Sequence, residues 1–148
     1  MSAMEYGGSD RRRGGPDRRS PGDTTRILIV DDHALFRAGV AGILVREPDF
    51  EVVGEADDAR SALDRALETS PDIILMDLSL PPPGGIDTTQ RIKRELPSSG
   101  IIVLAQTEDE DALFDAIKAG AAAFILKDVG PDDLVTIIRR VAVGEFLI

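Results

Sequence analysis

The sequence contains no cysteine and a single histidine, His33, among its 148 residues. Without cysteine the chain can form neither a disulfide framework nor a thiolate metal site, and one histidine cannot build a histidine cluster. We therefore expect any bound metal ion to be held by oxygen. No apolar run approaches the roughly 18 to 20 residues of a membrane span, and the N-terminus lacks the apolar stretch of a secretory signal. These absences predict a cytoplasmic protein without a membrane segment.

Basic residues are scarce beyond the first part of the chain. Residues 1–26 hold six arginines and four acidic residues, and the remainder holds eleven basic against twenty-three acidic residues. Such an acidic body repels phosphate backbones, so direct binding of nucleic acid is disfavoured. The early arginines are interleaved with Gly, Pro, Ser and Asp and show no apolar period. We predict a disordered tail over residues 1–25 and one domain over residues 26–148. Weak binding of the tail to an anionic partner is the less favoured alternative.

Short apolar runs alternate with amphipathic stretches five times from residue 26 onward. The predicted strands span residues 27–30, 51–55, 72–76, 101–104 and 123–126. The predicted helices span residues 33–46, 58–69, 85–96, 108–119 and 131–143, and Gly120 follows the fourth helix where a left-handed cap is favoured. Four runs are almost continuously apolar, as in strands buried on both faces, whereas the second alternates like an edge strand. The pattern predicts an α/β fold, a flavodoxin-like (βα)5 three-layer sandwich with a parallel sheet in the order 2-1-3-4-5.

Charged residues follow three of the predicted strands. Asp31 and Asp32 follow the first strand, Asp77 follows the third, and Lys127 follows the fifth. In such folds ligands bind beyond the carboxyl ends of the strands, where these side chains would meet. Close carboxylates repel one another, and one lysine leaves room for a divalent cation, for which Mg²⁺ suits oxygen ligands best. Asp77 is then the favoured nucleophile toward phosphorus, giving an acyl phosphate. Alone, Asp31 could instead cap the helix that follows.

These motifs resemble the receiver domain of two-component response regulators, from about Arg26 to the end of the chain. The resemblance is closest to the subfamily whose receivers precede a LuxR-type helix-turn-helix. It rests on the order and spacing of a few residues, namely Asp31, Asp32 and His33, then Asp77, Leu78, Ser79, Leu80, Pro81 and Gly85, then Lys127 after Ala119, Gly120 and Ala121.

The resemblance implies a role for each matching residue. Asp77 would accept a phosphoryl group from a histidine kinase, and Lys127 would pair with the phosphoryl oxygens. Asp32 would bind the metal ion directly and Asp31 partly through water. The backbone carbonyl of Ser79 would complete the protein's share of the metal ligands, with Asp77 among them.

One position departs from the family pattern. The family has Thr or Ser directly after the fourth strand, where the hydroxyl meets the phosphoryl group, whereas this sequence has Ala105. Either Gln106 or Thr107 substitutes for that hydroxyl, or the coupling between phosphorylation and conformation is weakened. Phe124 occupies the position of the aromatic switch residue, although ordinary packing is the favoured interpretation. Ser79 and Thr107 lie where the family tunes dephosphorylation.

Other classes of function remain as alternatives. A receiver-like interaction module that acts without phosphorylation is favoured by Ala105 and disfavoured by the intact acids and lysine. An aspartyl phosphatase would need an acid at Ser79, and a flavin carrier would need a phosphate-binding loop in place of Asp31 and Asp32. We therefore expect no enzyme beyond self-phosphorylation and autodephosphorylation.

The expected partners are a sensor histidine kinase and a second copy of the chain. Dimerisation would use the apolar stretch 137–143, for which packing against the sheet is the competing explanation. DNA binding is expected only through a helix-turn-helix domain that the sequence does not contain. Residues 145–148 resemble the start of a linker, which favours a fragment of a transcription factor over a stand-alone receiver.

Overall fold

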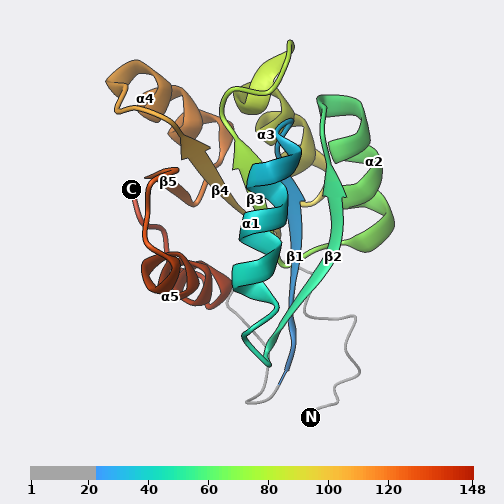
Figure 1. Ribbon diagram of the computed structural model, residues 1–148. Coiled ribbons are helices and arrows are strands. Elements are labelled where there is room, and N and C mark those ends of the chain that lie inside the picture. Colours follow the sequence, from blue (N-terminus) through green and yellow to red (C-terminus); the bar gives the residue numbers. More distant parts are fainter. Residues whose placement is uncertain (1–22) are drawn as a thin grey trace.

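The structure is a computed structural model that describes residues 23–148, so most of the predicted tail lies outside the described residues. Within this range five strands alternate with five helices (Figure 1). The strands are β1 (Thr25–Val30), β2 (Phe50–Ala56), β3 (Ile73–Asp77), β4 (Gly100–Ala105) and β5 (Ala123–Leu126). The helices are α1 (Ala34–Leu44), α2 (Ala59–Thr69), α3 (Gly84–Glu95), α4 (Glu110–Ala119) and α5 (Pro131–Ala142). All neighbouring strands pair in parallel, in the order β2-β1-β3-β4-β5.

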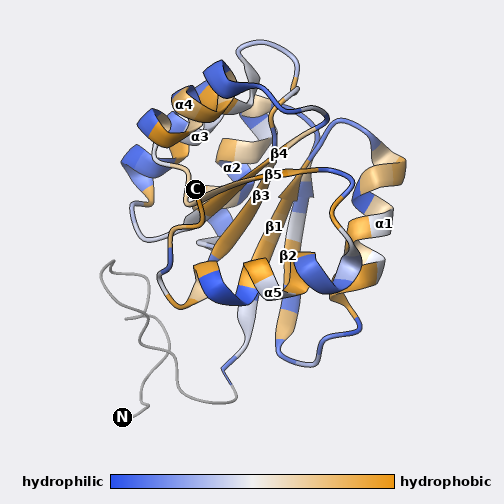
Figure 2. Cartoon of the chain, turned by 90° about the vertical axis from the view of Figure 1, so that its left-hand side faces the viewer, coloured by the Kyte–Doolittle hydropathy of each residue, from blue (hydrophilic) through white to orange (hydrophobic). Residues whose placement is uncertain are grey.

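Each inner strand contributes to two cores because successive side chains point to opposite faces of a sheet. In β1, Ile27 and Ile29 enter the core beneath α1 and α5, whereas Leu28 and Val30 enter the core beneath α2, α3 and α4. The two groups of helices cover opposite faces of the sheet (Figure 1). Apolar residues line the strands and polar residues lie on the outer faces of the helices (Figure 2). This burial on both faces explains the nearly continuous apolar runs of the inner strands.

The architecture confirms the predicted fold, strand order and edge position of β2. Gly120 ends α4 with a φ of 103°, the left-handed cap expected from the sequence. Element bounds shift by one or two residues from the prediction, because helix ends depend on local hydrogen bonds that periodicity does not show. The shift of most consequence is that Asp77 is the last residue of β3, and so the strand itself fixes its backbone.

The end of the chain lies against the sheet. Leu147 forms an isolated parallel bridge with Ala123, and its N–H donates to the carbonyl of Ala122 at 2.7 Å. The segment interpreted as the start of a linker is therefore partly paired with β5. In the stretch 137–143, Ile138 and Val141 are buried against the sheet, which accords with the packing explanation for these two residues.

None of the helices within residues 23–148 is both long enough and apolar enough to span a bilayer.

Two glycines differ sharply in the space around them. A Cβ on Gly85, at the start of α3, would lie 2.2 Å from the carbonyl oxygen of Asp77, so only glycine lets this helix approach the end of β3. A Cβ on Gly42, on the exposed side of α1, would have no atom of the described chain within 4 Å. Packing therefore requires glycine at position 85. At position 42 glycine has no such role and lowers the stability of α1, because it loses more conformational freedom on folding than other residues do.

Gly85→Ala should therefore lower the free energy of unfolding by about 1 to 3 kcal/mol through overpacking. Gly42→Ala should raise it by roughly 0.5 to 1 kcal/mol, because alanine favours an exposed helix interior. Urea unfolding followed by circular dichroism measures both. A Gly85→Ala protein as stable as the wild type would show that α3 can move away from β3 without loss.

Candidate functional site

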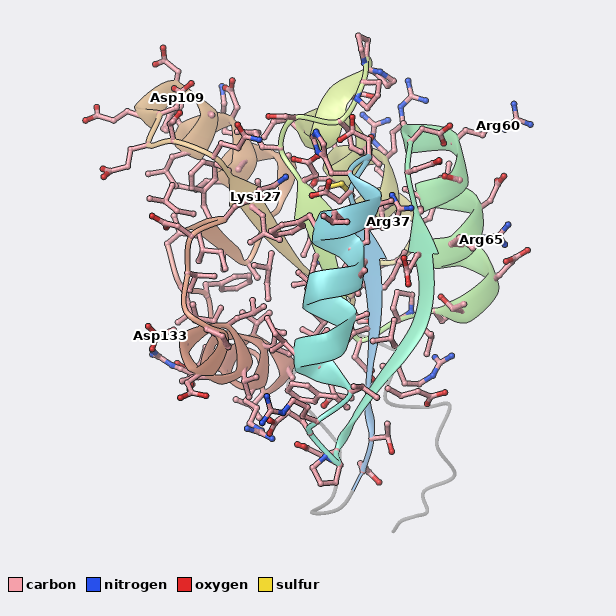
Figure 3. The ribbon with its side chains drawn as sticks, viewed as in Figure 1. Arg37, Arg60, Arg65, Asp109, Lys127 and Asp133 are labelled. Carbon is pink, nitrogen blue, oxygen red and sulfur yellow. The ribbon has the colours of Figure 1, made fainter. Side chains whose placement is uncertain are left out.

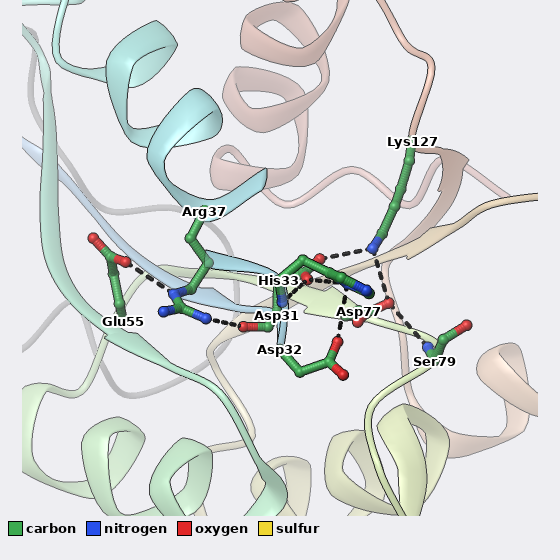
Figure 4. Close-up of polar contacts among 8 residues, drawn as sticks. All are labelled: Asp31, Asp32, His33, Arg37, Glu55, Asp77, Ser79 and Lys127. Atoms are coloured by element: carbon green, nitrogen blue, oxygen red, sulfur yellow. Dashed lines mark hydrogen bonds and ion pairs between the residues drawn. The ribbon is translucent and has the colours of Figure 1, made fainter. Parts of the chain in front are cut away.

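Three strand ends bring the predicted charged residues together at one edge of the sheet. Asp31 follows β1, Asp77 ends β3 and Lys127 follows β5. The Lys127 Nζ lies 2.7 Å from Asp31 Oδ2 and 3.2 Å from Asp77 Oδ1 (Figure 4). Both carboxylates are buried, with 1% and 0% of their side chains exposed. The convergence expected from parallel strand ends is therefore present in the structure.

One oxygen in this cluster lacks a donor. The Asp77 Oδ1 accepts the N–H of Ser79 at 3.0 Å and faces Lys127, whereas its buried Oδ2 has no hydrogen-bond partner within residues 23–148. A buried carboxylate oxygen without a partner is costly, and a cation beside it removes that cost.

Candidate ligand atoms surround this position. One side-chain atom each from Asp31, Asp32, His33 and Asp77 lies within 4.8 Å of the others. Three of these four groups are carboxylates, the ligands that hard divalent cations such as Mg²⁺ prefer. The residues present, together with the buried Asp77 Oδ2 that has no donor in the described part of the chain, fit a site for such an ion.

The pKa values of Asp77 and Lys127 are both raised, but for different reasons. Burial raises the pKa of Asp77 and the nearby Asp31 charge adds to the rise, while the Ser79 N–H and Lys127 oppose it without cancelling it. Burial lowers the pKa of Lys127, but its hydrogen bond to Asp31 and the charge of Asp77 outweigh burial and leave that pKa raised. Lys127 therefore stays cationic at neutral pH, whereas ionised Asp77 is held at a cost.

Asp31 and His33 share contacts at the start of α1. The Asp31 Oδ1 accepts the backbone N–H of His33 at 2.8 Å, so the carboxylate also orders the turn before the helix. The helix N-cap itself is His33, and Asp31 does not occupy the cap position considered for it. The His33 Nδ1 lies 3.2 Å from Asp31 Oδ1 and 3.1 Å from Asp32 Oδ1. The expectation of oxygen ligands alone did not include this nitrogen, although His33 directly follows the acidic pair.

The first turns of α1 contribute two contacts that sequence patterns did not indicate. The ring of Phe36 lies 4.6 Å from the Lys127 Nζ and provides a cation–π contact. Arg37 contacts the backbone of Asp31 and the side chain of Glu55 (Figure 4). In contrast, the labelled side chain of Arg60 points away from the body of the protein, and Asp109 caps α4 by accepting the N–H of Ala112 (Figure 3).

The structure places the predicted switch residues at and after the ends of β4 and β5, and their roles stay predictions. Ala105 is the buried last residue of β4, and its carbonyl accepts the N–H of Lys127 at 2.7 Å. Gln106 and Thr107 are exposed in the loop that follows. Phe124 is partly buried against the core beneath α2, α3 and α4.

Ser79 is exposed in the loop after β3. Its N–H contacts Asp77, while the proposed metal contact of its carbonyl stays a prediction.

Asp77→Asn should raise the stability of the metal-free protein at neutral pH. In the unfolded chain Asp77 ionises near a pKa of about 4. Because its pKa is higher in the folded protein, the free energy of unfolding falls as pH rises across the interval between the two values. Asparagine avoids this loss. The stability advantage of the variant should therefore be larger at neutral pH than near pH 4, as measured by urea unfolding.

Asp115→Asn controls for the loss of one negative charge from an acidic protein, because this carboxylate is exposed on α4. Asp115→Asn should increase the free energy of unfolding by less than Asp77→Asn does, and the increase should depend less on pH. An advantage of Asp77→Asn that is equal at both ends of the pH range would contradict the raised pKa.

Comparison with known proteins gives consistent matches over most of the chain. The model of the response regulator receiver domain family matches residues 27–139. The transcriptional regulatory protein LiaR of Bacillus subtilis (strain 168) is 42% identical over 120 residues, which cover 81% of this chain and 57% of LiaR. The chain thus spans about half the length of the curated relatives it matches.

Solved structures agree with this match. A LuxR-family two-component response regulator from Aurantimonas sp. SI85-9A1 has a TM-score of 0.81 and 36% identity, covering 85% of this chain and 90% of that chain. A second match is the isolated REC domain of RcsB from Salmonella enterica serovar Typhimurium, solved in the presence of phosphomimetic BeF₃⁻. It has a TM-score of 0.77 and 26% identity, and the match covers 84% of this chain and 93% of that chain. With its fold and its cluster of acids and lysine, the chain belongs to the response-regulator receiver domains of two-component systems and resembles those of LuxR-family regulators.

Proposed function

We propose that this domain is a phosphoacceptor, in which Asp77 takes a phosphoryl group from a sensor histidine kinase in a Mg²⁺-dependent reaction. The observation that carries the proposal is the buried Asp77 carboxylate, which faces Lys127 through one oxygen and has no donor within residues 23–148 for the other. Most buried side-chain polar atoms have a hydrogen-bond partner, so a structural aspartate at this depth usually has both oxygens satisfied. The arrangement instead supports a carboxylate kept available for a cation and an incoming phosphoryl group.

The transfer exchanges one bond to phosphorus for another. An Asp77 carboxylate oxygen forms a bond to phosphorus, and the bond between phosphorus and the donor imidazole nitrogen breaks. The electron pair stays with the imidazole, which takes up a proton from solvent if it leaves as the anion. Lys127, which the Asp31 carboxylate holds at 2.7 Å, offsets negative charge on the phosphoryl oxygens.

The metal ligands would be the carboxylates of Asp31, Asp32 and Asp77 and the backbone carbonyl of Ser79. A bound Mg²⁺ supplies charge neutralisation at the phosphoryl oxygens, which lowers their repulsion of the attacking carboxylate. Asp31 already contacts Lys127 through Oδ2, which accords with a less direct role for it than for the more exposed Asp32.

Phosphorylation would switch association between protein chains in the cytoplasm, most simply between two copies of this domain. Its output would be transcriptional control through a helix-turn-helix domain outside this chain. The proposal is supported by relatives described as transcriptional regulators, of which this chain covers about half. The acidic body of the domain also disfavours direct contact with DNA.

Ala105 favours a second candidate, an interaction module whose association does not depend on phosphorylation. The residue ends β4, is 1% exposed, and presents a methyl group where a hydroxyl would be needed to contact a phosphoryl oxygen. A third outcome lies between these two functions: Asp77 accepts the phosphoryl group, and the conformational response to phosphorylation is weakened.

Beryllofluoride with Mg²⁺ should shift the amide NMR signals around the pocket of the wild-type protein, because it mimics a phosphoryl group on the aspartate. Asp77→Asn should abolish these shifts, because the amide side chain can neither bind the beryllium nor carry the negative charge. Amide signals are suitable because the chain has no tryptophan for a fluorescence measurement. A small phosphodonor should likewise add one phosphoryl group only when Asp77 and Mg²⁺ are both present.

Lys127→Met gives a matched test of the positive charge, with beryllofluoride shifts expected to weaken rather than vanish. Wild-type protein that binds neither Mg²⁺ nor beryllofluoride would support the phosphorylation-independent module and contradict the phosphoacceptor. Phosphoryl uptake by Asp77→Asn would contradict the assignment of the acceptor residue.

Ala105→Thr should strengthen self-association in the presence of beryllofluoride by roughly tenfold, because a hydrogen bond to a charged group contributes about 1.5 to 3 kcal/mol. Ala105→Val is the matched control, since valine has the shape of threonine without the hydroxyl. Sedimentation velocity with and without beryllofluoride measures the dimerisation constant. Equal behaviour of the Thr and Val variants would show that the missing hydroxyl does not limit switching.

A further inference from the structure

Arg37 reaches from α1 across the end of β1 to the end of β2. Its Nη1 donates to the backbone carbonyl of Asp31 at 2.5 Å, and its Nε donates to the Oε1 of Glu55 at 3.1 Å (Figure 4). Only 18% of the Arg37 side chain is exposed, against 45% for Glu55. The guanidinium therefore joins three elements beside the acidic pocket, and neither of its two acceptors is a proposed metal-binding oxygen.

The carbonyl that Arg37 contacts lies just beyond the regular sheet. The N–H of Asp31 still donates to the carbonyl of Ala56, but β1 ends at Val30, where the strand ladder ceases to supply donors. Asp31 is 1% exposed, so its carbonyl is also removed from water. A buried carbonyl needs a donor, and the Arg37 guanidinium provides one.

This carbonyl belongs to the peptide that joins the two adjacent acids of the pocket. Because a peptide is planar, fixing its carbonyl fixes the direction in which the chain enters Asp32. The Asp31 carboxylate has further support from Lys127 and the His33 N–H. The Asp32 side chain is 32% exposed and contacts the exposed ring of His33. Asp32 therefore depends more on its backbone for position than Asp31 does.

We propose that Arg37, oriented by Glu55, is a positioning residue for the divalent-cation site. It holds the peptide between Asp31 and Asp32 so that the Asp32 carboxylate is directed toward the ion. The inference rests on the proposed Mg²⁺-dependent function of the same pocket and adds to it a residue that contacts neither ion nor phosphoryl group. Arginine suits the role because its rigid fork offers donors in two directions, whereas lysine offers one compact charge.

The pairing with Glu55 also limits an electrostatic penalty. An unpaired guanidinium next to a cation site would repel the ion, and the Glu55 carboxylate offsets that charge. Glu55 lies on β2, the strand that pairs with β1. Its second role is to hold the guanidinium in the orientation that contacts the Asp31 carbonyl.

The affinity for Mg²⁺ of the full chain and its variants, followed by amide NMR, tests the proposal. Arg37→Met should raise the Mg²⁺ concentration at half-saturation by about tenfold or more, as for other residues that support metal ligands. Arg37→Lys should recover part of the affinity, because it restores a donor for one of the two acceptors. The amide signals of Asp32 and His33 should also shift in the metal-free Arg37→Met protein.

Arg139→Met is the matched control. Arg139 likewise bridges elements by contacting Glu47 and Asp49, but it does so near Thr25, at the opposite end of β1 from the pocket. Its loss should reduce stability in urea while changing the Mg²⁺ midpoint by less than about twofold, because the ligands of the pocket stay in place.

Wild-type affinity in Arg37→Met, or an equal loss in Arg139→Met, would overturn the positioning role and leave the proposed function intact. Failure of the wild-type protein to bind Mg²⁺ would overturn both. If Arg37→Met does not fold, Arg37→Lys carries the test, because lysine keeps the positive charge but can donate to only one of the two acceptors. Arg37→Lys should then bind Mg²⁺ several-fold more weakly than the wild type, and wild-type affinity in that variant would overturn the proposal.

Discussion

Lys127 places one ammonium group between two buried carboxylates, 2.7 Å from an oxygen of Asp31 and 3.2 Å from an oxygen of Asp77. In a site removed from water, like charges repel strongly and an unpaired ion is costly. One cation cannot fully offset two buried anions together with the nearby Asp32. The pocket therefore keeps an excess of negative charge. This excess follows from the geometry of the sheet and favours the proposed binding of a divalent ion.

The sheet makes this unfavourable cluster possible. Asp31 and Asp77 stand at the ends of two paired inner strands whose apolar side chains fill cores on both faces. Close packing there keeps the backbone at the strand ends from relaxing away from the repulsion. Gly85 adds to this constraint because α3 meets the carbonyl of Asp77 at a distance that a side chain would not allow. The charge repulsion in the pocket lowers the stability of the fold, and the apolar packing of the two cores beneath it offsets that cost.

Helix α1 contributes to the site as well as to the core. Its buried side carries Val40 and Leu44 into the core, while its first turns direct Phe36 toward Lys127 and Arg37 toward the Asp31 carbonyl. The same helix therefore supplies an aromatic ring to Lys127 and a guanidinium to the Asp31 carbonyl. By contrast, Ala105 is buried at the end of β4 and has only a methyl side chain, so it supplies no hydroxyl to the proposed phosphoryl site.

The sequence by itself determined the fold and the central residues of the site. Apolar runs that alternate with amphipathic stretches require a parallel sheet covered by helices, and parallel strands place all their carboxyl ends at one edge. Asp31, Asp77 and Lys127 each stand at such an end, so their meeting followed from order along the chain. Only the tertiary structure decided the contacts of Phe36, Arg37 and the His33 ring, because these depend on the rotation of α1 about its axis and on side-chain direction. Periodicity assigns a helical residue to a face, but it does not say which atom of a distant strand that residue will meet.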